Sequence, residues 1–246
     1  MKTHFTFSEL IIIVSALTVL SSMTLPTSDR AAELARKTRC SSNIRQGVAG
    51  MMMYSERNDG WVSLYRSGHL SWFEFGGMPE ELGLPSGASI FPLDVRPVTF
   101  CPDVPVKNSP WPTTVCYGVP GFYHVTADDF NGVRKVELLT GVPLTLMVRH
   151  NILPDPASYV ILADSTYGPL HNPGNARQVS GNQAPFFLRR DAGFSAVSAR
   201  HLGQANLGFA DGHVADSQDR ERLLRQYHIA NLASPDGLRV TKLLAD

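Results

Sequence analysis

The sequence predicts an α+β fold in which one long N-terminal helix carries an antiparallel-sheet head. Residues 5–25 are almost continuously apolar, and the apolar positions between Ala32 and Met52 then recur about every 3.6 residues, the period of an α-helix. From Trp61 onward, short β-prone runs alternate with glycine and proline, as in antiparallel strands joined by turns. We therefore expect a helical part over 5–57 and an α+β head over 58–246.

The apolar run from Phe5 to Leu25 has about the length that a bilayer core requires of a helix, and it contains one carboxylate, Glu9. A cleaved secretory signal would end in a small-x-small site, whereas this run ends at Pro26 without one. A plain signal anchor explains the length and the flanking Lys2, but it gives no reason for Glu9. A third explanation comes from a resemblance.

The stretch Phe5–Val14, FTFSELIIIV, resembles the F-T-L-I-E-L-L-V-V-I signature of type IV prepilins and type II secretion pseudopilins. The resemblance implies that a prepilin peptidase removes the leader 1–4 by cutting between His4 and Phe5, after which the new amino group is methylated. It also implies that 5–25 is a transmembrane and assembly helix, in which Glu9 neutralises the N-terminus of a neighbouring subunit. The family usually has glycine where this chain has His4.

Beyond Pro26 the helix formers resume, so we expect the helix to continue through 26–57 into the head, with a kink at the proline. Residues 35–46, ARKTRCSSNIRQ, resemble the A-R-x-x-x-C-x-x-N-L-K-Q segment of pseudopilin-like proteins. At 1.5 Å per residue the whole helix measures roughly 80 Å. Its first half is too long and too apolar to be buried in its own head, so it needs lipid or other copies of itself.

The head shows short strands, a few of which also match the family. Residues 61–65 and 159–163 read as strands, and 144–148 as strand or helix. Residues 98–102 resemble the family's F-x-C-P element, and 156–165 its P-S-x-x-x-L-L-A-D-S element. The segment 166–190 is rich in Gly, Pro and Asn and predicts a surface loop.

A second specific motif lies in residues 200–216. Asp211-Gly212 predicts a two-residue type I′ hairpin turn between arms at 205–210 and 213–216. His201 precedes Asp211 by ten positions, which resembles the H-x9-D-G element of a prepilin-associated C-terminal domain. Asn206 and His213 belong to the same matched stretch.

Two histidines and an aspartate in this motif offer a weak candidate metal site, with His201, Asp211 and His213 as ligands of zinc or calcium. The simpler interpretation is that Asp211 bonds the turn, His213 flanks it, and His201 donates to a backbone carbonyl nearby. The chain contains no G-x-S-x-G, P-loop, H-E-x-x-H or C-x-x-C motif. We therefore predict that it is not an enzyme and has no resident cofactor.

The three cysteines are Cys40, Cys101 and Cys116, so at most one intrachain pair can form. The family often carries the first two, and the resemblance favours a Cys40–Cys101 disulfide. A Cys101–Cys116 pair and three buried free thiols are the alternatives.

The chain has 22 basic and 22 acidic residues, and this zero net charge argues against a nucleic-acid protein. We predict a structural subunit of a pseudopilus or type IV pilus-like filament of a secretion system. It would lie in the inner membrane by a single pass, with a cytoplasmic N-terminus and a head in the periplasm or in an extracellular filament. Its partners would be the prepilin peptidase, other pilin-like subunits, the inner-membrane assembly platform and the lipid bilayer.

The alternative function is a membrane-anchored extracytoplasmic binding module that does not polymerise. Aromatic side chains that stack on sugars would make it glycan-binding, with Trp61, Trp72 and Trp111 as candidates.

Overall fold

The structure, a computed structural model, describes residues 6–66, 72, 78–84, 97–103, 117–119, 134–139, 142–167, 195–227, 229, 231–234 and 240–242. Its described part is α+β, as predicted, with one long helix and strands that pair almost entirely antiparallel. The exception is β6, which pairs parallel to β9. The predicted leader 1–4, together with Phe5 and Cys116, lies outside the described residues.

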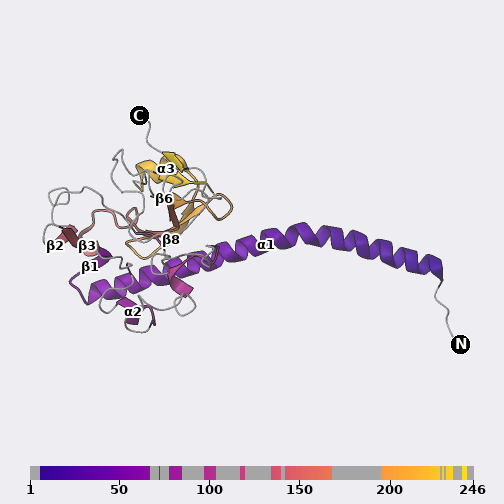
Figure 1. Cartoon of the computed structure of the whole chain (residues 1–246), viewed down its shortest axis with the longest axis horizontal. Coiled ribbons are helices and arrows are strands. Elements are labelled where there is room, and N and C mark those ends of the chain that lie inside the picture. The colour runs from indigo at the N-terminus through magenta and orange to yellow at the C-terminus, as the bar shows by residue number, and fades with distance from the viewer. Residues whose placement is uncertain are drawn as a thin grey trace.

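Helix α1 spans Phe7–Glu56 and continues through Pro26, which we expected to kink it. Figure 1 shows a gently curved rod whose N-terminal half projects away from the head, while its C-terminal half lies along the head. Thr6 is the N-cap, and Thr6 and Glu9 form a reciprocal capping box. At the other end, Asp59 and Gly60 adopt positive φ, and the Gly60 N–H donates to the Ser55 carbonyl at 2.8 Å, which ends the helix.

Among the described residues, none of the helices combines the length with the apolarity that crossing a bilayer requires. The predicted transmembrane segment over 5–25 and the predicted single-pass inner-membrane location are therefore wrong. In the described part of this segment, three hydroxyl side chains each bond a carbonyl of the preceding turn: Ser15, Thr18 and Ser21.

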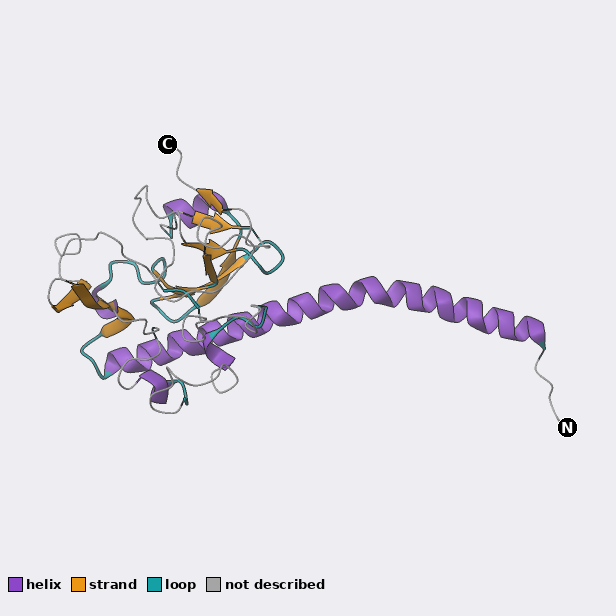
Figure 2. Cartoon of the chain, viewed as in Figure 1, coloured by secondary structure: helices purple, strands orange, loops and turns teal. Residues whose placement is uncertain are grey.

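Three small sheets make up the described head (Figure 2). Their strand orders are β1-β3-β2, β10-β9-β6-β5 and β4-β7-β8. The first two are built from β1 (Trp61–Arg66), β2 (Arg134–Leu139), β3 (Val142–Arg149), β5 (Ser165–Tyr167), β6 (Ser195–Ser198), β9 (Asn231–Ala233) and β10 (Val240–Lys242). The third contains β4 (Val160–Ala163), β7 (Ala205–Phe209) and β8 (Val214–Ser217). The short helical pieces are α2 (Met78–Glu81), η3 (Pro97–Thr99), η7 (His150–Ile152) and α3 (Arg220–Arg225).

The sequence had placed several of these elements. The predicted strands at 61–65 and 159–163 are β1 and β4, and the undecided segment 144–148 is part of strand β3. Only the first two residues of the predicted loop at 166–190 are described, and they extend strand β5.

The β4-β7-β8 sheet is covered on both faces. On one side, a fully buried face of α1 packs on it through Cys40, Ile44, Val48 and Met51. On the other side, β4 and β7 share a second core with Leu223 of α3 and with Tyr227, which follows that helix. The sheet is therefore the centre of the head.

Gly208 in β7 permits the close approach of α1. A Cβ atom on Gly208 would lie 2.5 Å from Val48 Cγ2 and 2.8 Å from Ile44 Cγ2, both on the helix. These distances are shorter than van der Waals contact, so the position requires a residue without a side chain.

The hairpin at the end of the predicted motif is confirmed, but its turn type is not. β7 and β8 pair antiparallel, and Gly212 has a φ of 94°. Among the described non-glycine residues, however, only Asp59 and Leu202 have positive φ, so Asp211 does not. The Gly212 N–H donates to the Phe209 carbonyl at 3.0 Å. The Phe209 N–H donates to the His213 carbonyl, also at 3.0 Å. This is a three-residue loop that ends in a left-handed glycine, not the predicted type I′ turn.

Candidate functional site

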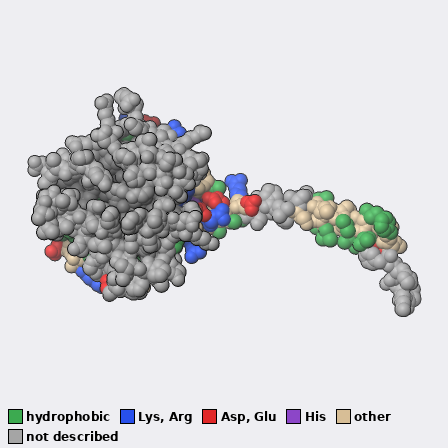
Figure 3. Space-filling model, in the orientation of Figure 1, with side chains coloured by type: hydrophobic (Ala, Val, Ile, Leu, Met, Phe, Trp, Pro, Cys, Tyr) green, Lys and Arg blue, Asp and Glu red, His purple; other side chains and the backbone are tan. Residues whose placement is uncertain are grey.

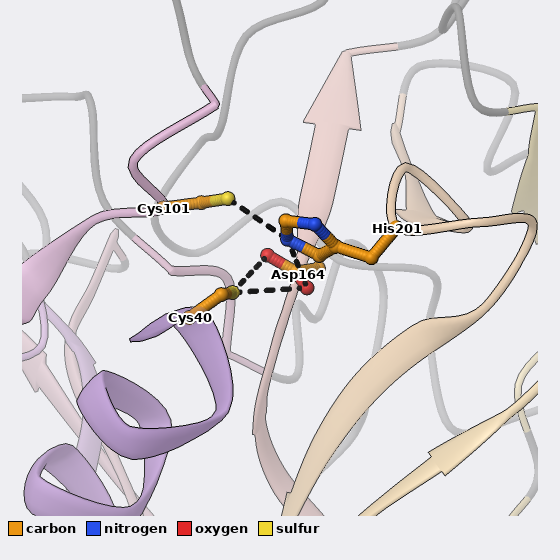
Figure 4. A group of neighbouring side chains, drawn as sticks. All are labelled: Cys40, Cys101, Asp164 and His201. Atoms are coloured by element: carbon orange, nitrogen blue, oxygen red, sulfur yellow. Dashed lines mark hydrogen bonds and ion pairs between the residues drawn. The ribbon is translucent and has the colours of Figure 1, made fainter. Parts of the chain in front are cut away.

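Four chemically reactive side chains meet in the interior of the head: Cys40, Cys101, Asp164 and His201 (Figure 4). Each is fully buried, and each comes from a different part of the chain. Cys40 lies on α1, and Cys101 follows η3. Asp164 connects β4 to β5, and His201 lies between β6 and β7. We call these four residues the Cys/Asp/His cluster.

Asp164 is held at the point where the chain passes from one sheet to another. Its N–H donates to the Asn206 carbonyl at 3.1 Å, which continues the pairing of β4 with β7. Its carbonyl accepts from the Ser198 N–H at 2.8 Å, which starts the pairing of β5 with β6. The side chain of Asn206 also donates to Asp164 Oδ2 at 3.1 Å. The backbone of both sheets therefore fixes this carboxylate.

His201 is fixed by a tight turn that the sequence did not predict. The His201 N–H and carbonyl both bond Gln204, and the two residues between them, Leu202 and Gly203, have φ values of 53° and 80°. Positive φ at both central positions defines a type I′ turn. The turn type predicted for Asp211-Gly212 thus occurs here, where it presents the imidazole of His201 to the interior.

Each sulfur of the cluster lies at hydrogen-bonding distance from a neighbour, whereas the imidazole and the carboxylate are slightly farther apart. Cys101 Sγ is 3.1 Å from His201 Nε2, and His201 Nε2 is 3.7 Å from Asp164 Oδ2. Cys40 Sγ lies 3.2 and 3.3 Å from the two carboxylate oxygens of Asp164. In addition, the Tyr117 hydroxyl donates to Cys40 Sγ at 3.3 Å.

The two thiols have different acidities because their neighbours differ. Burial raises the pKa of the Cys40 thiol well above its ordinary value, and the hydrogen bond with Cys101 and the charge of Asp164 act in the same direction. Burial also raises the pKa of Cys101, but the hydrogen bonds with Cys40 and His201 and the charge of Arg200 outweigh it, so this pKa is lowered overall. Cys101 is therefore the more acidic thiol of the pair.

The pKa of His201 is shifted in the opposite direction to that of Cys101. Burial lowers the pKa of His201, yet the hydrogen bond with Cys101 and the charges of Asp164 and Asp103 together raise it above the ordinary value. Its second ring nitrogen, Nδ1, lies 3.1 Å from Asp103 Oδ2 and 3.6 Å from Glu33 Oε1. Both of these carboxylates also pair with Arg36, at 2.7 and 2.6 Å.

No disulfide joins Cys40 and Cys101 in the structure, and their pairing remains a prediction. The prediction was correct about proximity, since both sulfurs lie within 4.8 Å of the other ligand atoms of the cluster. The resemblance did not indicate that Asp164 lies beside the sulfur of Cys40 or that His201 lies beside the sulfur of Cys101.

The weak metal candidates of the sequence do not gather at one place. His213 Nδ1 lies 2.5 Å from Asp211 Oδ1, and the His213 ring stacks on Phe209 at 4.1 Å. The His213 N–H donates to the same Asp211 oxygen at 3.1 Å, so this pair bonds the turn as the simpler interpretation proposed. His201 instead joins the Cys/Asp/His cluster, not a backbone carbonyl near the hairpin.

Glu9, the predicted assembly carboxylate, is exposed at the start of α1. Its Oε2 accepts from the Thr6 N–H at 2.8 Å and from the Thr6 hydroxyl at 2.6 Å. These bonds from Thr6 hold the pKa of the Glu9 carboxyl below its ordinary value. Within one chain, therefore, Glu9 caps its own helix.

The described N-terminal half of α1 presents apolar side chains on every side. The exposed ones are Phe7, Leu10, Ile11, Ile12, Ile13, Val14, Leu17, Val19 and Leu20. Figure 3 shows them as a green region at the far end of the rod. Five consecutive positions, 10–14, cover the full circumference of a helix that turns 100° per residue, so no single face is polar.

The tryptophans give little support to a sugar-binding surface. Trp72 is fully buried, and its Nε1 donates to the Tyr117 carbonyl at 3.0 Å. Trp61 is partly buried against the guanidinium of Arg149, 5.9 Å from the ring centre. Trp111 lies outside the described residues.

Sequence reasoning missed the cluster as a unit, although it had marked all four segments that form it. Four of the five segments that resemble the pilin-like family contribute one member each: 35–46, 98–102, 156–165 and 200–216. One reactive residue in each of four matched segments was the available signal. A comparison of the chain with protein-family models, curated proteins and solved structures finds no match.

Proposed function

We propose that this chain is a structural subunit that polymerises through the N-terminal half of α1 into a pseudopilus-like or type IV pilus-like filament of a secretion system. The observation that carries the proposal is the exposed apolar circumference of α1 between Phe7 and Leu20. A helix that is apolar all round is stable only when it is buried. The head packs on the other half of the helix, so it does not cover this part (Figure 1).

Other copies of the same helix are the occupants that fit this surface. A partner with one binding groove would cover one face and leave the opposite face in water. A bundle of parallel, staggered helices surrounds each member and covers all of its faces. The heads would then lie on the outside of the bundle, an arrangement that the projecting shape of the chain supports.

Glu9 supplies the specificity in this proposal. Burial of a carboxylate in an apolar bundle is unfavourable unless it is paired. In the assembled state, the amino terminus of a neighbouring subunit would pair with Glu9, as the prepilin resemblance implies. Cleavage after His4 would place that amino group at Phe5, close to the start of the apolar run.

The test separates the charge of Glu9 from its capping role. Glutamine also completes a capping box, so Glu9→Gln keeps the start of α1 and removes only the charge. We expect Glu9→Gln to abolish polymer formation by the full chain in producing cells, measured as a cysteine crosslinking ladder through Ile13→Cys. The control Glu56→Gln removes a charge from the exposed far end of the same helix and should leave the ladder intact. A normal ladder from Glu9→Gln would contradict the proposed mechanism.

A further inference from the structure

We propose that Cys40, Cys101, Asp164 and His201 are the four ligands of a structural zinc ion that joins α1 to the sheets of the head. This site is independent of the filament, because its ligand on α1, Cys40, lies in the C-terminal half of the helix, away from the exposed apolar part. It also differs from the metal site that the sequence suggested, with which it shares only His201.

The geometry of the cluster already approaches that of a tetrahedral site. Zinc binds sulfur at about 2.3 Å and imidazole nitrogen at about 2.0–2.1 Å, which places neighbouring ligands on the tetrahedron about 3.3–3.8 Å apart. The observed separations are 3.1 Å from Cys101 Sγ to His201 Nε2, 3.7 Å from His201 Nε2 to Asp164 Oδ2, and 3.3 Å from Asp164 Oδ2 to Cys40 Sγ. All four ligand atoms lie within 4.8 Å of one another, so small side-chain movements suffice.

The chemistry of the ligand set favours zinc over harder ions. Two thiols, one imidazole and one carboxylate combine soft and borderline donors, which suit zinc, whereas calcium and magnesium prefer shells of oxygen. A thiol is a weak hydrogen-bond donor, so two thiols are poor substitutes for a cation beside a buried carboxylate. A divalent ion would satisfy the sulfurs, the nitrogen and the carboxylate together.

The surroundings of the ligands resemble a second coordination shell. A zinc-bound histidine usually donates its other ring N–H to a carboxylate, which orients the ring. His201 Nδ1 lies 3.1 Å from Asp103 Oδ2, a distance that allows this contact, although Nδ1 makes no hydrogen bond within the described part of the structure. Asn206 donates to Asp164, and the Tyr117 hydroxyl donates to Cys40 Sγ, so two further ligands are held from behind.

Full burial assigns the site a structural role. A catalytic zinc keeps one position open for water or substrate, whereas a structural zinc has four protein ligands and is closed. All four side chains here have zero exposed surface. Cys101, His201 and Asp103 also follow one another as a nucleophile, a base and an orienting acid would, but His201 Nδ1 makes no hydrogen bond among the described residues, and a fully buried sulfur cannot meet a substrate.

The neighbouring acidic group is a weaker candidate. Glu33, Asp103 and His201 also place ligand atoms within 4.8 Å of one another. Both carboxylates there already pair with the guanidinium of Arg36, and they are only partly buried. We therefore assign them to the support of His201 and not to a second ion.

The first experiment measures metal in the full chain, purified under reducing conditions without added zinc. We expect about one zinc per chain, lost in Cys101→Ser and Asp164→Asn. The controls His213→Gln and Cys116→Ser remove an imidazole and a thiol outside the proposed ligand set and should keep the zinc. Unchanged zinc in Cys101→Ser, or no zinc in the wild type followed by no uptake of added zinc, would overturn the assignment.

The second experiment stays decisive when a ligand variant fails to fold. Cobalt in the zinc-free wild-type chain should give thiolate charge-transfer absorption in the near ultraviolet and intense visible bands typical of tetrahedral coordination. Asp103→Asn keeps every ligand and should weaken zinc binding about 10–100-fold, the usual effect of losing a carboxylate behind a histidine ligand. A Cys40–Cys101 disulfide in the native chain, seen as a loss of two mass units, or cobalt without thiolate absorption, would refute the site.

Discussion

The two halves of α1 obey the same helical geometry but differ in what covers them. In the N-terminal half, Ile12 and Ile13 are 65% and 43% exposed, although they are as apolar as any core residue. In the C-terminal half, Ile44 and Val48 are fully buried and lie on one face, which rests on the β4-β7-β8 sheet. The difference shows that hydrophobicity alone does not indicate what a helix packs against. A one-sided apolar pattern indicates a neighbour within the chain, whereas an all-round pattern indicates neighbours from outside it.

Matched charge substitutions in the two halves should give the largest contrast. Ile44→Asp places a carboxylate in the fully packed core, and a cost above about 4 kcal/mol should unfold the head. Ile13→Asp changes the exposed half and should alter the unfolding free energy of the head by no more than about 0.5 kcal/mol. Chemical denaturation followed by circular dichroism measures both. A head that Ile13→Asp destabilises as strongly would show that the two halves are not independent.

Truncation of apolar side chains gives a milder version of the same contrast. Leu162→Ala in β4 removes a fully buried side chain against α1 and should cost about 2–5 kcal/mol. Leu17→Ala removes the same atoms from a 56% exposed position and should cost about 0.5 kcal/mol or less. Equal shifts of the denaturation midpoint for the two variants would mean that Leu17 is covered in the isolated chain.

The glycine contact tests how closely the packed half fits. Gly208→Ala should cost about 1–3 kcal/mol, because the new methyl group meets Val48 Cγ2 at 2.5 Å. The double variant Gly208→Ala/Val48→Ala removes that clash, so its loss of unfolding free energy should be smaller than the sum of the two single losses. Simple additivity in the double-mutant cycle would show that β7 and α1 do not touch here.

The turn beyond β7 should contribute less. Asp211→Ala removes the acceptor of the His213 N–H, so we expect a cost of about 0.5–1.5 kcal/mol, measured by thermal unfolding. Asp211→Asn retains an acceptor oxygen and should recover most of the loss. An unaltered midpoint in Asp211→Ala would assign the turn to Gly212 and the strand pairing alone.

The smallest effect is the pH dependence at the start of α1. The pKa of Glu9 is lowered in the folded chain, so the stabilisation is fully present above the ordinary carboxyl value of 4.5 and is lost as the pH falls through the lower folded value. Below that range, hydrogen exchange of the first turn of α1 should accelerate while that of the packed half stays slow. Glu9→Gln should lack this pH step, and a step that remains would belong to another group.

Sequence reasoning was strongest where a local pattern determines the structure. The 3.6-residue period of Ile44, Val48 and Met51 predicted the buried face of α1, and the apolar run at 159–163 predicted β4. The same pattern also included Ala32 and Ala35, which are exposed in the structure. It included them because a helical period does not indicate at which residue the head begins.

The site was harder to predict because long-range pairing creates it. Asp164 and His201 look like an ordinary strand end and one histidine of a hairpin motif until β4 pairs with β7 and β5 with β6. The turn at Leu202-Gly203 lacks the usual Asn-Gly or Asp-Gly pair. The type I′ turn was therefore predicted at the nearby Asp211-Gly212 instead.

The side-on seating of α1 has a mechanical consequence. A pull along the axis of the rod would act on its contacts with β4 and β7 in shear, so that all of them resist together rather than opening one after another. The bare backbone at Gly208, seated against Val48 and Ile44, would resist sliding of the helix past the strand. When the chain is pulled by its exposed end, α1 would therefore stay bound to the head at forces that would detach a helix held only at its tip.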